Sequence, residues 1–172
     1  MASGGRDHPI LAQIPHLRRY AHALLGDRAR AEDLVQDCLE RAWSRFHLWR
    51  EGSNLRTWLF TIMHNLHANA ARTASRRPQT VPMDESSIVA PIRAAQEDGL
   101  ELASIETALA ALSEDQRQVI LLVGLEEMSY QEAAAVLGVP IGTVMSRLHR
   151  ARERLRQLLT GGGGVAALRR VK

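Results

Sequence analysis

Residues Ser129 to Leu159 read SYQEAAAVLGVPIGTVMSRLHRARERLRQLL, and this stretch decides the fold. Ser129 with Glu132 three residues later forms a capping box, which predicts that a short helix begins here. The Gly-Val-Pro that follows supplies a C-terminal cap and then a residue that cannot continue the helix. A second helix is predicted from about Gly142 to Thr160. Two helices joined by so short a turn are typical of a helix-turn-helix.

The second helix carries two faces. Apolar residues recur at steps of four, three and four and predict a buried stripe, formed by Val144, Leu148, Ala151 and Leu155. Beside this stripe, facing outward together, lie Met145, Ser146, His149 and Arg150. In a helix-turn-helix, this half of the second helix enters the DNA major groove, and basic residues further along pair with phosphates. The alternative interpretation is a basic helix whose outer face meets only solvent.

Charge is separated along the chain, although the net charge of the whole is only +3. The range 101–140 holds one basic residue against seven acidic ones, a net charge of −6. The range 141–172 holds eight basic residues against one acidic residue, a net charge of +7. A local basic stripe is the electrostatic footprint of a nucleic-acid surface, so this separation favours DNA binding.

Composition excludes several classes of protein. Cys38 is the one cysteine in 172 residues, which excludes a disulfide framework and a zinc site built on cysteines. No nucleophile–base pair, phosphate-binding loop or paired-carboxylate motif is evident, so we predict no enzymatic activity and no cofactor. His64 and His67 lack a partner at ligand spacing, so we also expect no metal site. Because the chain shows neither a signal peptide nor an apolar run of bilayer length, we expect a soluble, cytoplasmic protein without membrane insertion.

Helical spacing and proline content divide the chain into four parts. Ala, Leu, Arg and Glu dominate while strand-like alternation is scarce, which predicts an all-α protein of two small helical domains. Prolines interrupt the middle of the chain, where we expect a flexible linker that lets the domains move independently. The predicted parts are a first domain at 9–77, the linker at 78–98, a second domain at 99–160 and a flexible tail at 161–172.

Three helices are predicted in the first domain. Periodic apolar residues end at Gly26, and Asp27 then caps a second helix at about 30–48. A third helix follows the turn at 51–54. In the second domain, Ser113 forms another capping box three residues before Gln116. Most aromatic side chains are expected in the core, namely Trp43, Phe46, Trp58 and Phe60, whereas Trp49 is expected at the surface.

Three segments resemble the extracytoplasmic-function (ECF) sigma factors of bacteria. RAEDLVQDCLERAW at 30–43 is similar to the region 2.2 helix of that family, and NLRTWLFTIMHNLHANAAR at 54–72 is similar to its regions 2.3 and 2.4. LSEDQRQVILL at 112–122, followed by the helix-turn-helix, is similar to its region 4. The resemblance runs from about Leu11 to Leu159 in matching order and spacing. Among branches of the family, the NLRTWLFTI and LLVG sequences resemble those of the alphaproteobacterial general-stress group.

The resemblance implies a role in transcription initiation. A sigma factor binds core RNA polymerase, places it at promoters and helps to melt the DNA. The first domain would be a region 2 helical bundle that contacts the −10 element, and the second a region 4 helix-turn-helix that contacts the −35 element. The partners implied are core RNA polymerase, promoter DNA and an anti-sigma factor, within a stress response.

The resemblance also assigns roles to individual residues. The family's polymerase-docking face corresponds to Glu32, Asp33, Gln36, Asp37 and Glu40, although an acidic face can equally be only solvated. Candidates for the −10 element are Arg50, Ser53, Asn54, Arg56 and Asn65, with Arg72, Arg76 and Arg77 as phosphate contacts. Met145, Ser146, His149 and Arg150 match the base-contacting positions for the −35 element, and Thr143 is placed for a phosphate contact.

Three other kinds of protein compete with this interpretation. A sigma-like antagonist would imitate the fold but should have lost the basic DNA faces, and both are present here. A simple helix-turn-helix regulator would need a dimerisation element and would not need the face at Asp33 and Gln36. A purely structural helical adaptor would leave the charge separation unexplained.

Overall fold

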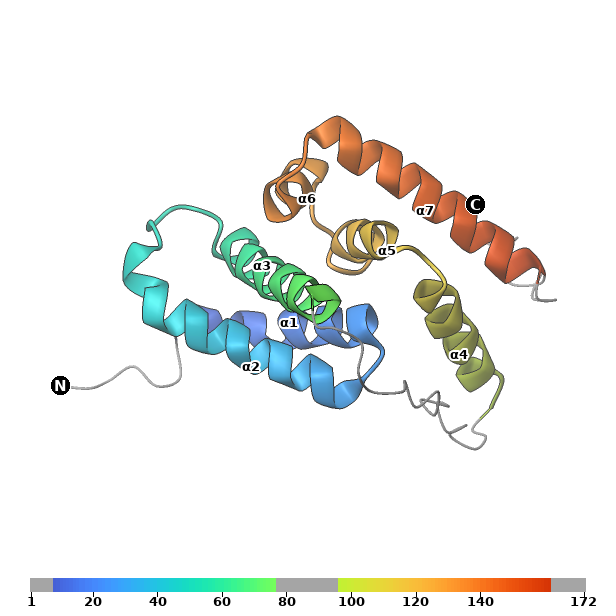
Figure 1. Cartoon of the computed structure of the whole chain (residues 1–172), viewed down its shortest axis with the longest axis horizontal. Coiled ribbons are helices and arrows are strands. Elements are labelled where there is room, and N and C mark those ends of the chain that lie inside the picture. Colours follow the sequence, from blue (N-terminus) through green and yellow to red (C-terminus); the bar gives the residue numbers. More distant parts are fainter. Residues whose placement is uncertain (1–7, 77–95, 162–172) are drawn as a thin grey trace.

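A computed structural model describes residues 8–76 and 96–161, and within these ranges every regular element is a helix. The predicted all-α architecture of two small domains is confirmed (Figure 1). The elements are α1 (Pro9–Leu25), α2 (Arg28–Arg45), the 3-10 turn η1 (Phe46–Leu48), α3 (Leu55–Arg76), α4 (Gln96–Ala110), α5 (Glu114–Ile120), the π turn η2 (Leu121–Leu125), α6 (Tyr130–Leu137) and α7 (Ile141–Gly161). Among these helices, none combines the length and the apolar character that a membrane span requires.

Local capping interactions fix where helices begin. Ser129 Oγ accepts a hydrogen bond from the Glu132 amide at 3.2 Å, and the Glu132 carboxylate accepts one from the Ser129 amide at 2.8 Å. The same reciprocal pair joins Ser113 and Gln116 at the start of α5. Asp27 caps α2 by accepting from a main-chain amide at 2.9 Å. These contacts satisfy amides that a helix leaves unpaired, and they confirm the predicted caps.

Three apolar helix faces meet in the core of the first domain. Tyr20 of α1 and Phe60 of α3 pack edge to face, with ring centroids 5.2 Å apart. Cys38 of α2 lies in the same core, and its burial raises the pKa of the thiol to about 12. The thiol is therefore protonated and unreactive at neutral pH. The largest buried side chains of this core are Ile10, Leu17, Tyr20, Val35, Leu59, Phe60 and Met63.

The helix-turn-helix forms as the sequence predicts. α6 ends at Gly138, which adopts a left-handed φ of 65° that a glycine reaches without strain. α7 begins directly after Pro140 and turns its stripe of Val144, Leu148 and Ala151 inward, where each is at most 2% exposed. This stripe packs against α5 and α6, so the opposite side of α7 is the side that faces solvent.

Details of the first domain differ from the sequence-based expectations. α2 ends at Arg45, because Phe46 begins a 3-10 turn that closes the helix earlier than the predicted residue 48. Trp43 is 52% exposed rather than in the core, because it lies just outside the buried stripe of α2 and rests on His8 instead. Trp49 is half-buried rather than at the surface, because its ring stacks on Phe46 with centroids 5.4 Å apart.

Two predicted boundaries also shift. α4 begins at Gln96, so the last three residues assigned to the linker are helical. α7 continues to Gly161, the first residue assigned to the tail. The rest of the predicted linker and tail lies outside the described residues.

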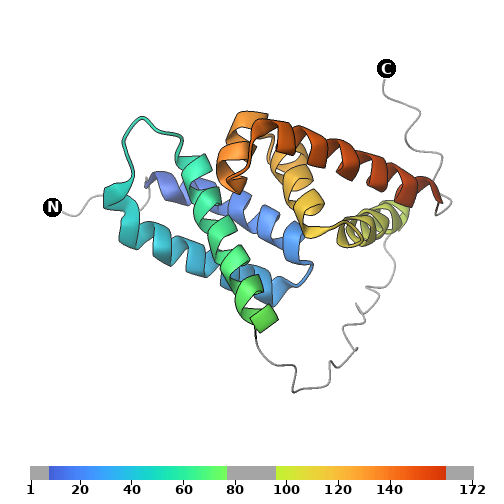
Figure 2. The same ribbon diagram turned by 45° about the horizontal axis from the view of Figure 1, so that its top comes forward.

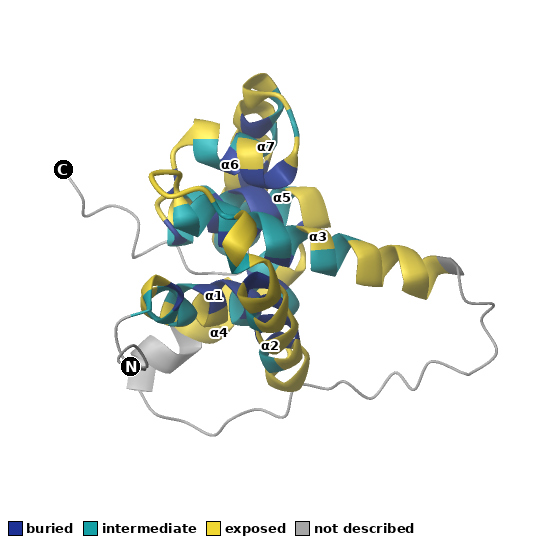
Figure 3. Ribbon diagram, turned by 90° about the vertical axis from the view of Figure 1, so that its left-hand side faces the viewer, coloured by how far each residue is buried: buried dark blue, intermediate teal, exposed yellow. Residues whose placement is uncertain are grey.

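The two domains pack against each other in a closed arrangement, which the expectation of independent domains did not anticipate. α3 lies against α6, and α1 lies beside η2 (Figure 2). The other half of α3 projects from the bundle and is exposed from Asn69 to Ser75 (Figure 3). Many of the contacts between the domains are made by charged side chains, whose partners cannot be identified from hydrophobic periodicity.

Candidate nucleic-acid interface

α7 presents a polar outer face opposite its buried stripe. Met145 is 53% exposed, and Ser146, His149 and Arg150 are exposed beside it. Thr143 lies half-buried in the first turn, where its carbonyl accepts a hydrogen bond from the Ser146 hydroxyl at 3.1 Å. The five predicted residues thus share the N-terminal half of one helix. They offer donors, acceptors and one apolar contact, which is the mixture that base edges in a major groove require.

Only some cations of α7 are free to meet a phosphate. Arg147 forms an ion pair with Asp115 of α5 at 2.9 Å, which ties α7 to its own domain. Arg150, Arg152 and Arg154 are exposed and form no ion pair within the described residues. The charge of the whole helix therefore overstates the charge available for DNA, and three arginines remain available to a ligand.

The acidic face of α2 divides into two parts. Glu32 accepts a hydrogen bond from Arg18 at 3.1 Å, and its other oxygen lies 2.9 Å from His22 Nε2. The hydrogen bond with His22, more than the charge of Arg18, lowers the pKa of the Glu32 carboxyl. Glu32 therefore joins α2 to α1, whereas the other residues of the predicted face are exposed, namely Asp33, Gln36, Asp37 and Glu40.

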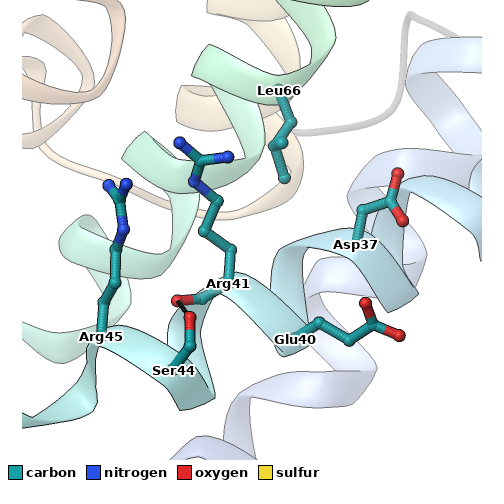
Figure 4. A pocket seen from close by; sticks show the side chains of 6 residues that line it. All are labelled: Asp37, Glu40, Arg41, Ser44, Arg45 and Leu66. Atoms are coloured by element: carbon teal, nitrogen blue, oxygen red, sulfur yellow. Dashed lines mark hydrogen bonds between the residues drawn. The ribbon is translucent and has the colours of Figure 1, made fainter.

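The acidic face borders a groove between α2 and α3 that is lined by both acidic and basic side chains (Figure 4). Asp37 and Glu40 lie at one end of the groove, and the guanidinium groups of Arg41 and Arg45 lie at the other, beside Leu66 of α3. Sequence reasoning missed Arg41 and Arg45, although their spacing of four residues places them on one side of a helix.

The turn before α3 is held by its own backbone. The Ser53 amide and hydroxyl both donate to the Arg50 carbonyl, at 3.0 and 2.7 Å. Gly52 adopts a φ of 93°, which side chains other than hydrogen strongly disfavour. Asn54 Oδ1 caps α3 by accepting from the Thr57 amide at 3.1 Å. The predicted residues Arg50, Ser53 and Asn54 are exposed and lie together at this turn.

The other candidates for the −10 element are spread along α3. Arg56 lies in its first turn, and Asn65 and Arg72 are exposed further along. A rise of about 1.5 Å per residue separates Arg56 from Arg72 by roughly 24 Å, so these residues follow a track rather than line one pocket. Arg76 ends the helix, and Arg77 lies outside the described residues.

Arg56 is engaged by the second domain. Its Nη2 lies 2.6 Å from Glu126 Oε2 and also donates to the Glu126 carbonyl at 2.6 Å. Arg19 Nε donates to the other carboxylate oxygen at 2.9 Å, and His16 Nδ1 lies 3.0 Å from Oε2. Glu126 is 0% exposed, so three side chains of the first domain enclose one carboxylate of the second.

Two further contacts join the domains beside this cluster. Asn54 Nδ2 donates to Glu132 Oε1 at 2.5 Å, so a second predicted −10 residue also touches a carboxylate of the second domain. Arg117 donates to the Leu24 carbonyl of α1 at 3.1 Å. Sequence reasoning missed His16, Arg19 and Glu126 because nothing in their spacing marks them. The one available signal is a pair of glutamates that interrupts an otherwise apolar run, LLVGLEEM.

The histidines of α3 lie against α5. His67 Nε2 is 2.9 Å from Glu114 Oε1, and burial lowers the pKa of His64. Within residues 8–76 and 96–161, no three His, Cys, Asp or Glu side chains gather closely enough to hold a metal ion.

Two family models match the chain, one on each domain. The first, described as the sigma2 domain of PhyR, matches residues 10–64. The second, described as sigma-70 region 4, matches residues 102–155. Together they follow the division into two helical domains.

Curated proteins and solved structures show the same similarity. The chain is 40% identical to the ECF RNA polymerase sigma factor EcfG of Rhodopseudomonas palustris (strain TIE-1), over 87% of this chain and 82% of that protein. It is 37% identical to the ECF sigma factor SigL of Mycobacterium tuberculosis (strain ATCC 25618 / H37Rv), over 83% and 82% of the two chains.

The sigma factor RpoE from Bartonella quintana, solved with the anti-sigma factor NepR, has a TM-score of 0.74 and 41% identity, covering 88% of this chain and 94% of RpoE. CnrH, solved with the cytosolic domain of CnrY, has a TM-score of 0.66 and 28% identity over 88% and 85% of the chains. With an identity of 40% over more than four-fifths of a relative's length, and with region 4 matched on its helix-turn-helix, this chain belongs to the ECF sigma factors of bacterial RNA polymerase.

Proposed function

We propose how this sigma factor divides promoter recognition between its two domains. The second domain would read the −35 element with Met145, Ser146, His149 and Arg150, and Thr143 would contact a phosphate. The observation that carries this assignment is the outer face of α7, which gathers all five residues on one half of a helix whose other side is buried. Further along α7, the guanidinium groups of Arg152 and Arg154 are exposed, which supports additional contacts with phosphates of the DNA backbone.

Core polymerase would dock on α2. Asp33, Gln36, Asp37 and Glu40 are exposed on one side of the helix, which supports a direct contact with the polymerase. Glu32 is bonded within the first domain, so we assign it to positioning α2 on α1 rather than to docking. Four of the five residues predicted to contact core polymerase are therefore kept in the proposed docking surface.

The −10 element would meet the turn before α3 and then the track along that helix. Arg50, Ser53 and Asn54 offer polar groups at the turn, and Arg56, Asn65 and Arg72 continue along α3, with Arg76 and Arg77 completing the predicted set. A strand separated from its partner needs cations along its backbone, and this arrangement supports that role. Asn54 and Arg56 are bonded to the second domain, so the domains must separate before both can bind DNA.

An anti-sigma factor is the proposed regulatory partner, and a stress response is the proposed setting. The relative RpoE was solved with the anti-sigma factor NepR, and CnrH with the cytosolic domain of CnrY. Both cover most of this chain, which supports an anti-sigma factor for it too. The protein would act in the cytoplasm as a non-enzymatic initiation factor without a cofactor.

A sigma-like antagonist without initiation activity is the competing function. The family model matched by the first domain is described as the sigma2 domain of PhyR, and PhyR from Bartonella quintana is described as an anti-anti-sigma factor. The exposed arginines of α7 favour initiation, since an antagonist has no need to bind DNA. The experiment that separates the two adds the purified chain to bacterial core RNA polymerase on supercoiled templates with randomised −35 and −10 elements. Initiation activity yields transcripts that share both elements, and an antagonist yields none.

A further inference from the structure

Glu126 is the one carboxylate, in the part of the chain described, that is wholly buried. Acidic side chains are almost never fully buried unless they are paired, because removing a carboxylate from water is costly. Here the pairing comes entirely from the other domain. His16 and Arg19 reach it from α1 and Arg56 reaches it from α3, and we call these three side chains the cationic cradle.

The backbone around Glu126 is shaped to deliver this carboxylate. The preceding turn η2 is a π turn, in which the Glu126 amide donates to the Leu121 carbonyl at 2.9 Å. Glu127 follows with a φ of 54°, a left-handed conformation that is unfavourable for a residue with a side chain. Arg19 Nη2 also donates to the Leu125 carbonyl at 3.1 Å, so the first domain binds the main chain of this turn as well as the carboxylate.

The cradle has the chemistry of a phosphate site. Arginine forks bind carboxylates and phosphates alike, because both present two or more oxygens to parallel N–H donors. The cradle side chains of Arg19 and Arg56 are 50% and 28% exposed, so they would be open to a ligand once the second domain moved away. Asn54 lies next to Arg56 in sequence and is likewise bonded to a carboxylate of the second domain, that of Glu132.

We propose that the cationic cradle of His16, Arg19 and Arg56 is a binding site for a backbone phosphate of promoter DNA, and that Glu126 occupies it in the closed arrangement. This proposal rests on the proposed function, in which Arg56 contacts the −10 region. It adds two residues of α1, His16 and Arg19, to the DNA-binding surface. It also makes closure and phosphate binding at the cradle mutually exclusive, because the carboxylate and the phosphate require the same donors.

The experiment measures binding of a labelled single-stranded oligonucleotide of mixed sequence to the full chain over a series of salt concentrations. Glu126→Gln removes the competing charge, so it should strengthen binding by about tenfold, the effect of roughly 1.4 kcal/mol. The slope of log affinity against log salt should steepen by about 0.7 for each additional phosphate of the single strand that the protein neutralises. Far-UV circular dichroism checks the fold, and Glu126→Ala, which also removes the charge, replaces Glu126→Gln if the latter does not fold.

Arg19 and Arg18 provide a matched comparison. They are neighbours on α1 with exposed fractions of 50% and 57%, but Arg18 is bonded to Glu32 and not to Glu126. In the Glu126→Gln chain, Arg19→Ala should weaken binding by about tenfold and reduce the salt slope by about 0.7, the value of one phosphate. Arg18→Ala in the same chain should leave the salt slope unchanged.

Two results would overturn the proposal. Equal effects of Arg19→Ala and Arg18→Ala would mean that the cradle binds Glu126 but no phosphate. Unchanged binding in the folded Glu126→Gln or Glu126→Ala chain would mean that the carboxylate does not compete with DNA. Transcription by the unaltered chain with core polymerase is measured separately. Loss of that activity would reject the proposed function, whereas a normal transcription result with a flat salt response would reject the phosphate site alone.

Discussion

The guanidinium of Arg56 lies 2.6 Å from the carboxylate of Glu126, although the two residues are 70 positions apart and belong to different domains. Arg56 is one of the residues predicted to face the −10 element, so in this arrangement the second domain covers part of the proposed DNA-binding surface of the first. The same holds for Asn54, which Glu132 binds. If the proposed −10 contacts of Asn54 and Arg56 are made, recognition of a promoter requires a change in the relative position of the domains.

Replacing Glu126 with glutamine should open the closed arrangement. Breaking a buried ion pair costs roughly 3–5 kcal/mol, and we expect about 2–3 kcal/mol here because Arg19 and Arg56 can return to water. Spin labels on Ser44→Cys in α2 and Gln131→Cys in α6 would report a longer and broader distance distribution. Cys38 is buried with a raised pKa, so it stays unlabelled. Glu153→Gln, which removes a carboxylate from the outside of α7, is the control and should leave the distances unchanged.

Arg150 should read bases, whereas Arg154 should hold the backbone. Both are exposed on α7, but Arg154 lies one turn further from the end of the helix that enters the groove. Arg150→Ala should cost about 1–3 kcal/mol on the best −35 sequence and flatten the preference at one or two positions. Arg154→Ala should weaken all sequences alike. The measurement is holoenzyme binding to single-base −35 variants at one fixed salt concentration, and an equal loss on every variant for Arg150→Ala would reassign it to a phosphate.

The exposed part of the acidic face should govern binding to core polymerase. Asp33→Arg combined with Gln36→Ala reverses an exposed charge and removes an exposed amide, which in the free chain donates a long hydrogen bond of 3.4 Å to Glu40 Oε1 on the same helix. We expect core affinity to fall by at least tenfold, about 1.4 kcal/mol, with unchanged helical content. Glu51→Arg is the control, because it reverses an exposed charge in the turn and away from α2. Equal affinities for the two variants would remove this face from the docking surface.

Acidification should destabilise the contact between α3 and α5 through His64. Burial is the main cause that lowers the pKa of His64, with His67 adding to it and Gln118, Glu114 and Asp115 opposing it. In the unfolded chain the His64 side chain takes up a proton near pH 6.5, whereas in the folded chain it stays neutral to a lower pH. The free energy of unfolding is therefore highest above pH 6.5 and decreases as the pH falls below that value. Glutamine does not titrate, so the free energy of unfolding of the His64→Gln chain should fall less than that of the unaltered chain between pH 7.5 and pH 5.5, a range chosen to span that pKa. Urea unfolding at each pH measures this free energy. Parallel pH profiles would show that His64 is not the group responsible.

Local signals in the sequence account for much of the fold. Ser113, Asp27 and Ser129 cap the helices that follow them, and the stripe from Val144 to Ala151 is buried, because caps and helical periodicity depend on residues close in sequence. The face of α7 opposite that stripe could be derived in the same way. The prediction that Trp43 lies in the core was wrong because this residue borders the apolar stripe of α2. Helical periodicity does not distinguish a position within such a stripe from the position next to it.

The closed arrangement could not be predicted, because it depends on contacts between residues far apart in the chain. Glu126 in isolation is one more acidic residue in an acidic segment, and Arg19 is one of two adjacent arginines. Only the packing of α1 and α3 against the second domain shows that Arg19 pairs with Glu126 and that this carboxylate is buried. Sequence reasoning assigned Asn54 and Arg56 to DNA without any indication that the same chain also binds them.

The buried position of Glu126 has a consequence for copies of the protein that are not assembled with polymerase. Under the proposed function, a closed copy covers Asn54 and Arg56 and could not engage the −10 element alone, although the outer face of α7 stays exposed. Synthesis of the factor in excess over polymerase would then leave −10 elements accessible to complete enzyme. The output of the regulated genes would follow the number of assembled enzymes rather than the number of factor molecules.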